Sequence, residues 1–397
     1  MEAVEEPTDR SQSEAGDGDP AAEPASHAAA GCPVAWCPIC ITVTAVQPLR
    51  PEVVEHLLKA GTEMLLAFRG VIDARADELR PPDDDEGSAG LEKIDIGGTK
   101  IVALRLDADG TELARATHPT PAEDMDATLD ELVAALGEVM GPDVGAVGVG
   151  AAGLVEAETG ILRFAPNLAW RNAPIRDVVA RATGVPVVVD NDCTAAAYGE
   201  FRVGAAKDVA DTLYLGVGTG IGGGLILGGS LYRGAHGFAA EAGHIVVEEG
   251  GPLCGCGNRG CLETVASGRA ITREGRAAAR DHPPLAARAG GDPDAVTGPI
   301  VVEAARDGDA VARGIVGEAG RRLGVGIAGL VNVLDPSLVV IGGGVAGAGD
   351  LLLAPAREAY ARTVEGGAYR PEVPIVEAGL GTDSVAIGAA LLALDGG

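Results

Sequence analysis

Apolar and polar positions alternate along two long parts of this chain, and each part opens with strands bent at glycines. The first part, LEKIDIGGTKIVALRLDADGTELARATHPT, starts at Leu91 and has short apolar runs separated by a Gly turn and an Asp-Gly turn. The runs ALRL and LARA alternate as strands with one solvated face do. We therefore predict three strands, then a helix over Ala122–Met140 and a buried strand, VGAVGVG, which gives the order β-β-β-α-β.

A similar pattern returns in the second half of the chain. The segment Thr212–Gly234, TLYLGVGTGIGGGLILGGSLYRG, again reads as strand, Gly turn, strand, Gly turn and strand. A helix over Gly317–Leu334 and a strand over Leu338–Val345 follow it. Two units that each open with a glycine-bent hairpin predict a duplicated α/β architecture with a cleft between two lobes.

The N-terminal region has a different composition. Residues 1–50 are expected to form an acidic tail, disordered to about Ala30, and then a cysteine-containing segment. Three cysteines of that segment supply half of a zinc site at most: Cys32, Cys37 and Cys40. A fourth ligand would have to come from His27 or His56 across the fold, so thiols in a small apolar patch are the favoured interpretation.

An amphipathic helix and a linker are predicted to follow. Over residues 51–80, apolar positions recur at spacings of four and three: Val54, Leu58, Gly61, Leu65, Phe68 and Ile72. This stripe needs a partner, either the rest of the chain or a second copy. Residues 81–90, PPDDDEGSAG, form a charged linker that marks a domain boundary.

Composition excludes several classes of function. The chain has 397 residues, enough for two or three domains, and a net charge of −28, so a nucleic-acid-binding surface is not expected. The acidic N-terminus is not expected to be a signal peptide, and the apolar stretch 33–46 is too short and too rich in proline to cross a bilayer. With its cysteines clustered, the protein is expected in the cytoplasm, without a membrane partner.

Candidate metal-binding and substrate-binding side chains are concentrated between Glu241 and Glu263, in EAGHIVVEEGGPLCGCGNRGCLE. One imidazole and three thiolates complete a tetrahedral zinc shell there: His244, Cys254, Cys256 and Cys261. The two glutamates bracket these ligands, which is uncommon for a metal site that only stabilises a fold. We hypothesise that zinc shapes a loop whose carboxylates hold a substrate.

Two glycine-rich turns are candidates for phosphate binding. DIGGTK (Asp95–Lys100) lacks the P-loop pattern, and GVGTGIGGG (Gly216–Gly224) leads into a strand where a dinucleotide fingerprint would lead into a helix. Glycines that merely permit tight hairpins are the alternative for either turn alone. Two turns in a duplicated frame favour backbone amides that grip a triphosphate.

The motifs DIGGTK, VDNDCTAAAYGE, GVGTGIGGG and EAGH…CGCGNRGCLE, in this order, resemble the ROK (repressor, open reading frame, kinase) sugar kinases. These belong to the actin-like ATPase superfamily, with a ribonuclease H-like, two-lobe α/β fold. APNLAWR and SGRA bring the chain nearest to actinobacterial ATP-dependent glucokinases. The resemblance implies a small lobe at 91–205, completed by a C-terminal helix at 381–397, and a large lobe at 206–380 with the zinc loop; residues 1–90 are an extra module.

The resemblance also implies roles for individual residues. Asp192 would be the catalytic base, and it could also, or only, cap the helix predicted over Thr194–Phe201. Sugar hydroxyls would be bound by Gly153, Asn167, Asn191, Glu241, His244 and Glu263. The ATP site would comprise Asp95, which orients magnesium through water, with Gly97, Gly98, Thr99, Lys100, Gly218, Thr219 and Gly220 at the phosphates and Gly342, Gly343 and Gly344 at the adenosine.

The expected activity is therefore the transfer of phosphate from ATP to glucose, yielding glucose 6-phosphate, with magnesium and a structural zinc. The alternatives are a kinase for another hexose or an N-acetylhexosamine, or a sugar-sensing regulator acting through its N-terminal module. A homodimer or homotetramer is expected, and the N-terminal module is a candidate for binding a protein partner. Three departures from the family pattern stand out: Cys193 and Thr194 where Ala and Asn are common, Lys93 in a first strand that we predict to be short, and the extra N-terminal region.

Overall fold

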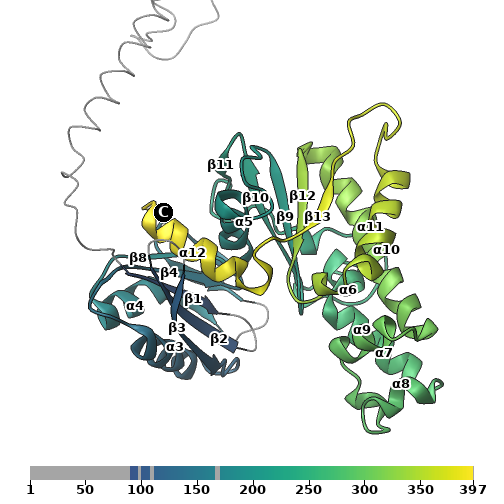
Figure 1. Ribbon diagram of the computed structural model, residues 1–397, viewed down its shortest axis with the longest axis horizontal. Helices are drawn as coiled ribbons and strands as arrows, with labels where there is room; N and C mark the ends of the chain where they lie inside the picture. Colours follow the sequence, from purple (N-terminus) through teal and green to yellow (C-terminus); the bar gives the residue numbers. More distant parts are fainter. Residues whose placement is uncertain (1–89, 97–99, 108–110, 166–169, 397) are drawn as a thin grey trace, which may run out of the picture. The chain divides into compact units, whose positions relative to one another are not determined.

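The computed structural model describes residues 90–96, 100–107, 111–165 and 170–396 (Figure 1). Side chains are described from Lys100 onward within these ranges. The chain divides into two units, 1–85 and 86–397, and the described residues belong to the second. The predictions for the tail, the cysteine segment, the amphipathic helix and most of the linker lie outside the described residues.

The first sheet has five strands in the spatial order β3-β2-β1-β4-β8. Its strands are β1 (Gly90–Ile96), β2 (Lys100–Leu106), β3 (Glu112–Pro119), β4 (Val144–Ala151) and β8 (Val187–Asn191). The β3-β2-β1 part is antiparallel, and β1, β4 and β8 are parallel. Helix α3 (Met125–Val139) follows β3, so the predicted β-β-β-α-β order is confirmed. It begins later than predicted because Asp124 caps it by accepting a hydrogen bond from the Ala127 amide (3.1 Å).

The second sheet repeats this arrangement in the order β11-β10-β9-β12-β13. Its strands are β9 (Thr212–Val217), β10 (Ile221–Leu227), β11 (Ser230–Leu231), β12 (Leu338–Gly342) and β13 (Ile375–Glu377). The first three are again antiparallel, and β9, β12 and β13 are parallel. The two sheets therefore share one topology, and the predicted duplication is confirmed.

Three details differ from the sequence predictions. The first strand is not short: β1 spans Gly90–Ile96 and pairs along its length with β2 and β4. Helix α10 (Ala310–Leu334) begins before the predicted Gly317, since Asp309 caps it through the Ala312 amide (2.9 Å). Strand β12 ends at Gly342 and not at Val345, because Gly343 adopts φ +83°, outside the strand region.

The remaining elements surround the two sheets. A small antiparallel sheet that the sequence did not predict contains β5 (Leu154–Glu156), β6 (Ile161–Phe164) and β7 (Arg171–Ala173). The described residues also form the helices α4 (Ile175–Thr183), α6 (Leu262–Ala266), α7 (Gly268–Ala279), α8 (Pro283–Ala287), α9 (Gly298–Arg306), α10 and α11 (Asp350–Thr363). Each sheet has its own buried apolar cluster. None of the helices in the described ranges is both long and apolar enough to span a bilayer.

Helices α5 (Asp192–Val203) and α12 (Ser384–Leu394) connect the two sheets. Helix α12 packs against β4 and β1 of the first sheet, whereas α5 packs against β10 and β9 of the second. The two helices approach so closely that a Cβ on Gly388 would lie 1.6 Å from the Ala195 carbonyl oxygen. The buried Glu200 carboxylate fastens them by accepting hydrogen bonds from the Ser384 hydroxyl (2.8 Å) and the Leu380 amide (2.9 Å).

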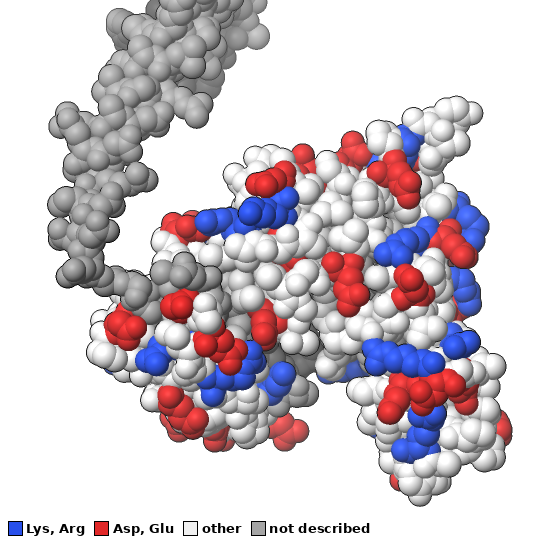
Figure 2. All heavy atoms as spheres, viewed as in Figure 1, with Lys and Arg blue, Asp and Glu red and all other residues white. Residues whose placement is uncertain are grey.

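Acidic and basic side chains lie next to one another over the face shown in Figure 2. Exposed ion pairs include Arg280–Asp294 and Arg288–Asp307, each 2.7 Å long. Such exposed pairs stabilise a protein by only about 0–1 kcal/mol. The two buried apolar clusters therefore account for more of the stability than the surface charges.

Candidate active site

The predicted base stands where a buried strand turns into a helix. Strand β8 ends at Asn191, and α5 begins at Asp192. The Asn191 side chain caps this helix by accepting a hydrogen bond from the Thr194 amide (3.0 Å). The alternative that Asp192 is the helix cap is therefore wrong, and the helix starts two residues earlier than Thr194. Asp192 itself accepts a hydrogen bond from the Cys193 amide (2.8 Å).

The Asn191 side chain also contacts Gly153, another residue predicted to bind the sugar. Its side-chain Nδ2 donates to the Gly153 carbonyl oxygen (3.1 Å). Gly153 has φ +133°, and a Cβ there would lie 2.4 Å from the Phe164 carbonyl oxygen, so only glycine fits. After these two hydrogen bonds, the Asn191 amide retains one N–H donor and one acceptor position for a ligand.

Burial raises the pKa of Asp192 above its ordinary value of 3.8, because removing the carboxylate from water disfavours its charged form. Hydrogen bonds from Cys193 and Asn191 oppose this shift without cancelling it. A carboxylate with a raised pKa is a better proton acceptor, as general-base catalysis requires.

Glu241 and His244 lie at the two ends of the same short helix, and Glu241 interacts electrostatically with both Asp192 and Glu263. Glu241 precedes the short helix η1 (Ala242–His244), and its carboxylate lies 3.9 Å from His244 Nε2. Glu263, on α6, accepts a hydrogen bond from the Ile221 amide (3.0 Å). The pKa of Glu241 is raised by burial, lowered by His244, and raised further by the negative charges of Asp192 and Glu263. Glu241 thus lies within electrostatic reach of two other carboxylates, and such a group favours a ligand that donates several hydrogen bonds.

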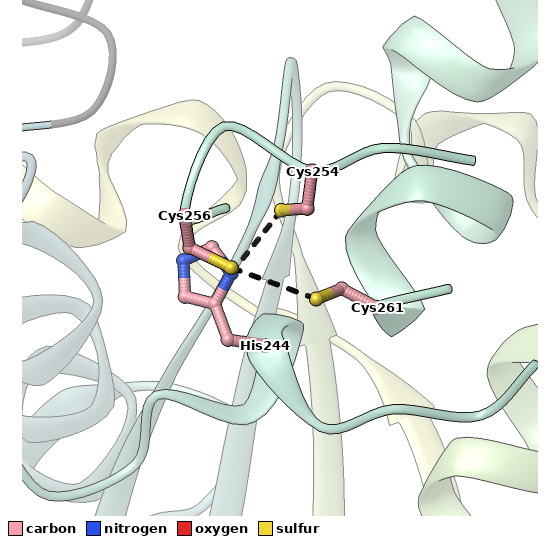
Figure 3. A group of neighbouring side chains, drawn as sticks. All are labelled: His244, Cys254, Cys256 and Cys261. Carbon is pink, nitrogen blue, oxygen red and sulfur yellow. Dashed lines mark hydrogen bonds between the residues drawn. The ribbon is translucent and has the colours of Figure 1, made fainter. Parts of the chain in front are cut away.

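The four predicted metal ligands lie together in the loop between η1 and α6 (Figure 3). Their ligand atoms all lie within 4.8 Å of one another. The Cys256 and Cys261 sulfurs are 3.7 Å apart, and the Cys254 sulfur is 3.5 Å from His244 Nδ1. A tetrahedron with Zn–S near 2.3 Å and Zn–N near 2.05 Å has edges of about 3.8 Å and 3.6 Å. The donor set and its spacing thus fit a tetrahedral zinc ion.

Tight backbone contacts hold this loop in shape. The Cys254 amide donates to the Asn258 carbonyl oxygen (2.8 Å), which closes the turn that carries Cys256. A Cβ on Gly260, whose φ is +70°, would lie 1.6 Å from the Glu248 carbonyl oxygen. His244 turns Nδ1 towards the sulfurs, so its Nε2 faces Glu241. A metal ion on Nδ1 would therefore fix the direction of Nε2 as well.

The predicted phosphate turn and adenosine glycines lie beside each other. Within the turn, the Gly218 amide donates to the Gly220 carbonyl oxygen (2.9 Å). Because that amide is used inside the turn, it does not face outward as predicted. The Val345 amide donates to the Val217 carbonyl oxygen (3.0 Å), which brings Gly342–Gly344 against the turn.

The sequence predictions left out the start of α7. The Gly268 amide donates to the Gly218 carbonyl oxygen (2.8 Å), and a Cβ on Gly268 would lie 3.3 Å from Val345. Helix α7 thus begins between the phosphate turn and the adenosine glycines. The SGRA motif (Ser267–Ala270) was the available signal, since it was noted in the sequence without being assigned to the site.

Other predicted site residues stay predictions. Asp95 pairs by its backbone with Val102 and Gly150, and nothing is described of its side chain. Lys100 is exposed at the start of β2. Gly97, Gly98, Thr99 and Asn167 lie outside the described residues.

Comparisons with known proteins agree with this fold. The ROK family matches residues 92–396, and an uncharacterized protein family matches residues 37–94. The glucokinase of Streptomyces coelicolor is 42% identical over 305 residues, which cover 76% of this chain and 96% of that protein. The glucokinase of Thermotoga maritima is 36% identical over 269 residues, covering 67% of this chain and 85% of that one.

Among solved structures, a ROK family glucokinase from Streptomyces griseus in complex with glucose and AMPPNP is 42% identical, with a TM-score of 0.73. The match covers 77% of this chain and 99% of that one. The fold is thus the duplicated, ribonuclease H-like fold of the actin-like ATPases, as predicted from the sequence. More narrowly, the chain belongs to the ROK family.

Proposed function

We propose that this protein is an ATP-dependent glucokinase that transfers the terminal phosphate of ATP to glucose and releases glucose 6-phosphate and ADP. The observation that carries the proposal is that the Glu241 carboxylate lies within electrostatic reach of both Asp192 and Glu263. Glucose has no charge and many hydroxyl groups, so carboxylates that accept hydrogen bonds suit it. Two relatives at 42% and 36% identity bear the name glucokinase, which supports glucose as the substrate.

In the proposed reaction, Asp192 accepts the proton of the attacking sugar hydroxyl as the new P–O bond forms and the bond to ADP breaks. Positioned bases of this kind contribute roughly 10²–10⁴-fold to a rate. Asn191, Gly153, Glu241, His244 and Glu263 bind the other hydroxyls and orient the sugar. A site built on such hydrogen bonds rejects a sugar that leaves a buried carboxylate unpaired.

The nucleotide would bind at the turn Gly218–Gly220, at the start of α7 and at Gly342–Gly344. Magnesium neutralises charge on the phosphates in such transfers. Zinc bound by His244 and the three cysteines would hold the loop and supply no chemistry to the transfer. A homodimer or homotetramer, a cytoplasmic location and a protein partner for residues 1–90 stay predictions.

The proposal is tested by measuring ADP release with glucose, mannose, fructose and N-acetylglucosamine under identical conditions. We expect the highest kcat/KM with glucose. A higher kcat/KM with another sugar would make the chain a kinase of that sugar. Binding of glucose without ADP release from any of the four would favour the sugar-sensing alternative.

A further inference from the structure

A buried ion pair lies next to the proposed base and takes no part in the mechanism above. Arg233 Nε donates to the Asp190 carboxylate at 2.7 Å. The Asp190 side chain is 2% exposed and that of Arg233 is 26% exposed. The other Asp190 oxygen accepts a hydrogen bond from the Asn191 amide (2.8 Å). The pair therefore fixes the backbone at the end of β8, where Asn191 and Asp192 follow.

General stabilisation is a poor explanation for this pair. Two charges taken out of water lose their hydration, and their attraction seldom exceeds that loss by much. Burial indeed raises the pKa of Asp190, while the Arg233 charge and its hydrogen bond lower it. Apolar side chains of similar size would stabilise the fold equally well. What the ion pair offers in addition is a fixed distance and direction between two segments.

Arg233 belongs to the segment that leads to Glu241. This segment, 232–240, connects β11 of the second sheet to η1. The Ala239 amide donates to the Arg233 carbonyl oxygen (3.0 Å), which closes the segment into a compact loop. Gly237 (φ +83°) lies against β5, where a Cβ would be 2.9 Å from the Val155 carbonyl oxygen. Both of these contacts restrict the path of the chain to Glu241.

The last residue before Glu241 is constrained as well. Ala240 has φ +66°, which is unfavourable for a residue with a Cβ, so its surroundings must hold it there. Its carbonyl oxygen lies 2.5 Å from where a Cβ on Gly223 would be, so that β10 blocks its movement. Glu241 therefore has few alternative positions, and the Arg233–Asp190 pair ties its segment directly to the end of β8.

We propose that Arg233 and Asp190 are positioning residues for the sugar site. The pair holds the segment that carries Glu241 at a fixed place relative to the strand end that carries Asn191 and Asp192. This inference rests on the proposed function for the roles of those three residues. The two paired side chains act through them and touch neither the sugar nor the phosphates.

The test compares the wild-type protein with Arg233→Met and with a matched control, Arg280→Met. Arg280 forms an ion pair with Asp294 of the same length, 2.7 Å, but both side chains are exposed. We expect Arg233→Met to raise the Kd and the KM for glucose at least tenfold and to lower kcat by up to about 100-fold, as misplacement of reacting groups by about 1 Å does. The KM for ATP should change by less than about twofold, and Arg280→Met should behave as the wild type.

A purely structural role would lower the melting temperature and the active fraction of Arg233→Met without changing the Kd for glucose. That result would overturn the inference. Glucose affinity is measured by calorimetry without ATP, so this test does not depend on turnover. Absence of ATP-dependent glucose phosphorylation by the wild-type protein would instead contradict the proposed function.

Two further variants keep the test informative if Arg233→Met folds poorly. Asp190→Asn keeps the size of the side chain and removes its charge, so the ion pair is lost with little change in packing. If the two residues act as a unit, the double variant Asp190→Asn/Arg233→Met should lose no more glucose affinity than the worse single variant. Losses that multiply in the double variant would show two independent effects and would overturn the proposed pairing.

Discussion

Asp192 occupies a position where three local influences meet. It is the first residue of α5, it lies next to the asparagine that caps this helix, and its side chain loses hydration on folding. Because Asn191 supplies the cap, Asp192 is not needed to end the strand or to start the helix. A carboxylate that is costly to bury and has no capping duty is typical of a catalytic group.

Asp192→Asn should therefore separate catalysis from glucose binding. We expect kcat to fall by about 10²–10⁴-fold, since the amide cannot accept the proton, while the Kd for glucose changes by less than about fivefold. Kinetics and calorimetry on the same preparation measure both. A variant that keeps more than about a tenth of the wild-type kcat would contradict the role of Asp192 as base.

The same substitution has a consequence for stability. Because the folded protein raises the pKa of Asp192, the folded state binds its proton more tightly than the unfolded state does. Ionisation therefore costs stability as pH rises through the folded-state pKa, and this cost is absent below the unfolded value. Asp192→Asn should melt at a higher temperature than the wild type at pH 7, and the difference should vanish in acid. A lower melting temperature at pH 7 would contradict this.

Individual site residues were predictable from the sequence when they belong to a motif with a chemical signature. Glu241, His244 and the three cysteines share one short segment, and Asn191 and Asp192 share another. The Asp190–Arg233 pair was not predictable, because its members are 43 residues apart and neither stands in an unusual pattern. The capping by Asn191 was missed because Asn and Asp, both good caps, are neighbours there.

At the scale of elements, the loop between η1 and α6 would let a bound metal position the proposed sugar ligands. His244 at its start and Cys261 at its end are both metal-ligand candidates, and Glu241 and Glu263 lie just outside them. The Val246–Cys261 bridge and the Leu262 amide, which donates to the Ile245 carbonyl oxygen (2.9 Å), join the two ends. Zinc would therefore add rigidity to an element that the backbone already closes.

Cys256→Ser tests this coupling, because Cys256 is exposed and its substitution disturbs no apolar core. We expect zinc content to fall from about one ion per chain towards zero, and the Kd for glucose to rise at least tenfold. The KM for ATP should change little. Cys193→Ser is the control for zinc content, which it should leave unchanged. Full zinc content in Cys256→Ser, or unchanged glucose affinity after zinc loss, would contradict the coupling.

The glycine-bent hairpins were the elements most readily predicted. Their glycine turns and their alternating apolar and polar side chains both indicate strands. The local sequence preference therefore agrees with the fold that the whole chain adopts. The strands β5, β6 and β7 were missed because they are only three or four residues long and contain several charged residues. The start of α10 was misplaced because Asp309, its cap, was not weighed in the sequence.

At the scale of the whole molecule, the duplication explains why one chain can bring a sugar and a nucleotide together. Each sheet carries a hairpin and parallel strands whose ends present glycines or acidic residues. Helices α5 and α12 lie between the sheets and are fastened by the buried Glu200. The sequence predicted the two repeats, but the close contact of α5 with α12 depends on small residues packing across the fold, which periodicity does not reveal.

The central claim is that this protein makes glucose 6-phosphate from glucose and ATP. The most direct measurement is the yield of glucose 6-phosphate, detected with an NADP-linked dehydrogenase, together with the ADP formed in the same reaction. We predict that the purified full-length protein produces the two in equal amounts and that omission of glucose stops both. ADP without glucose 6-phosphate, or neither product at saturating glucose and magnesium-ATP, would contradict the account.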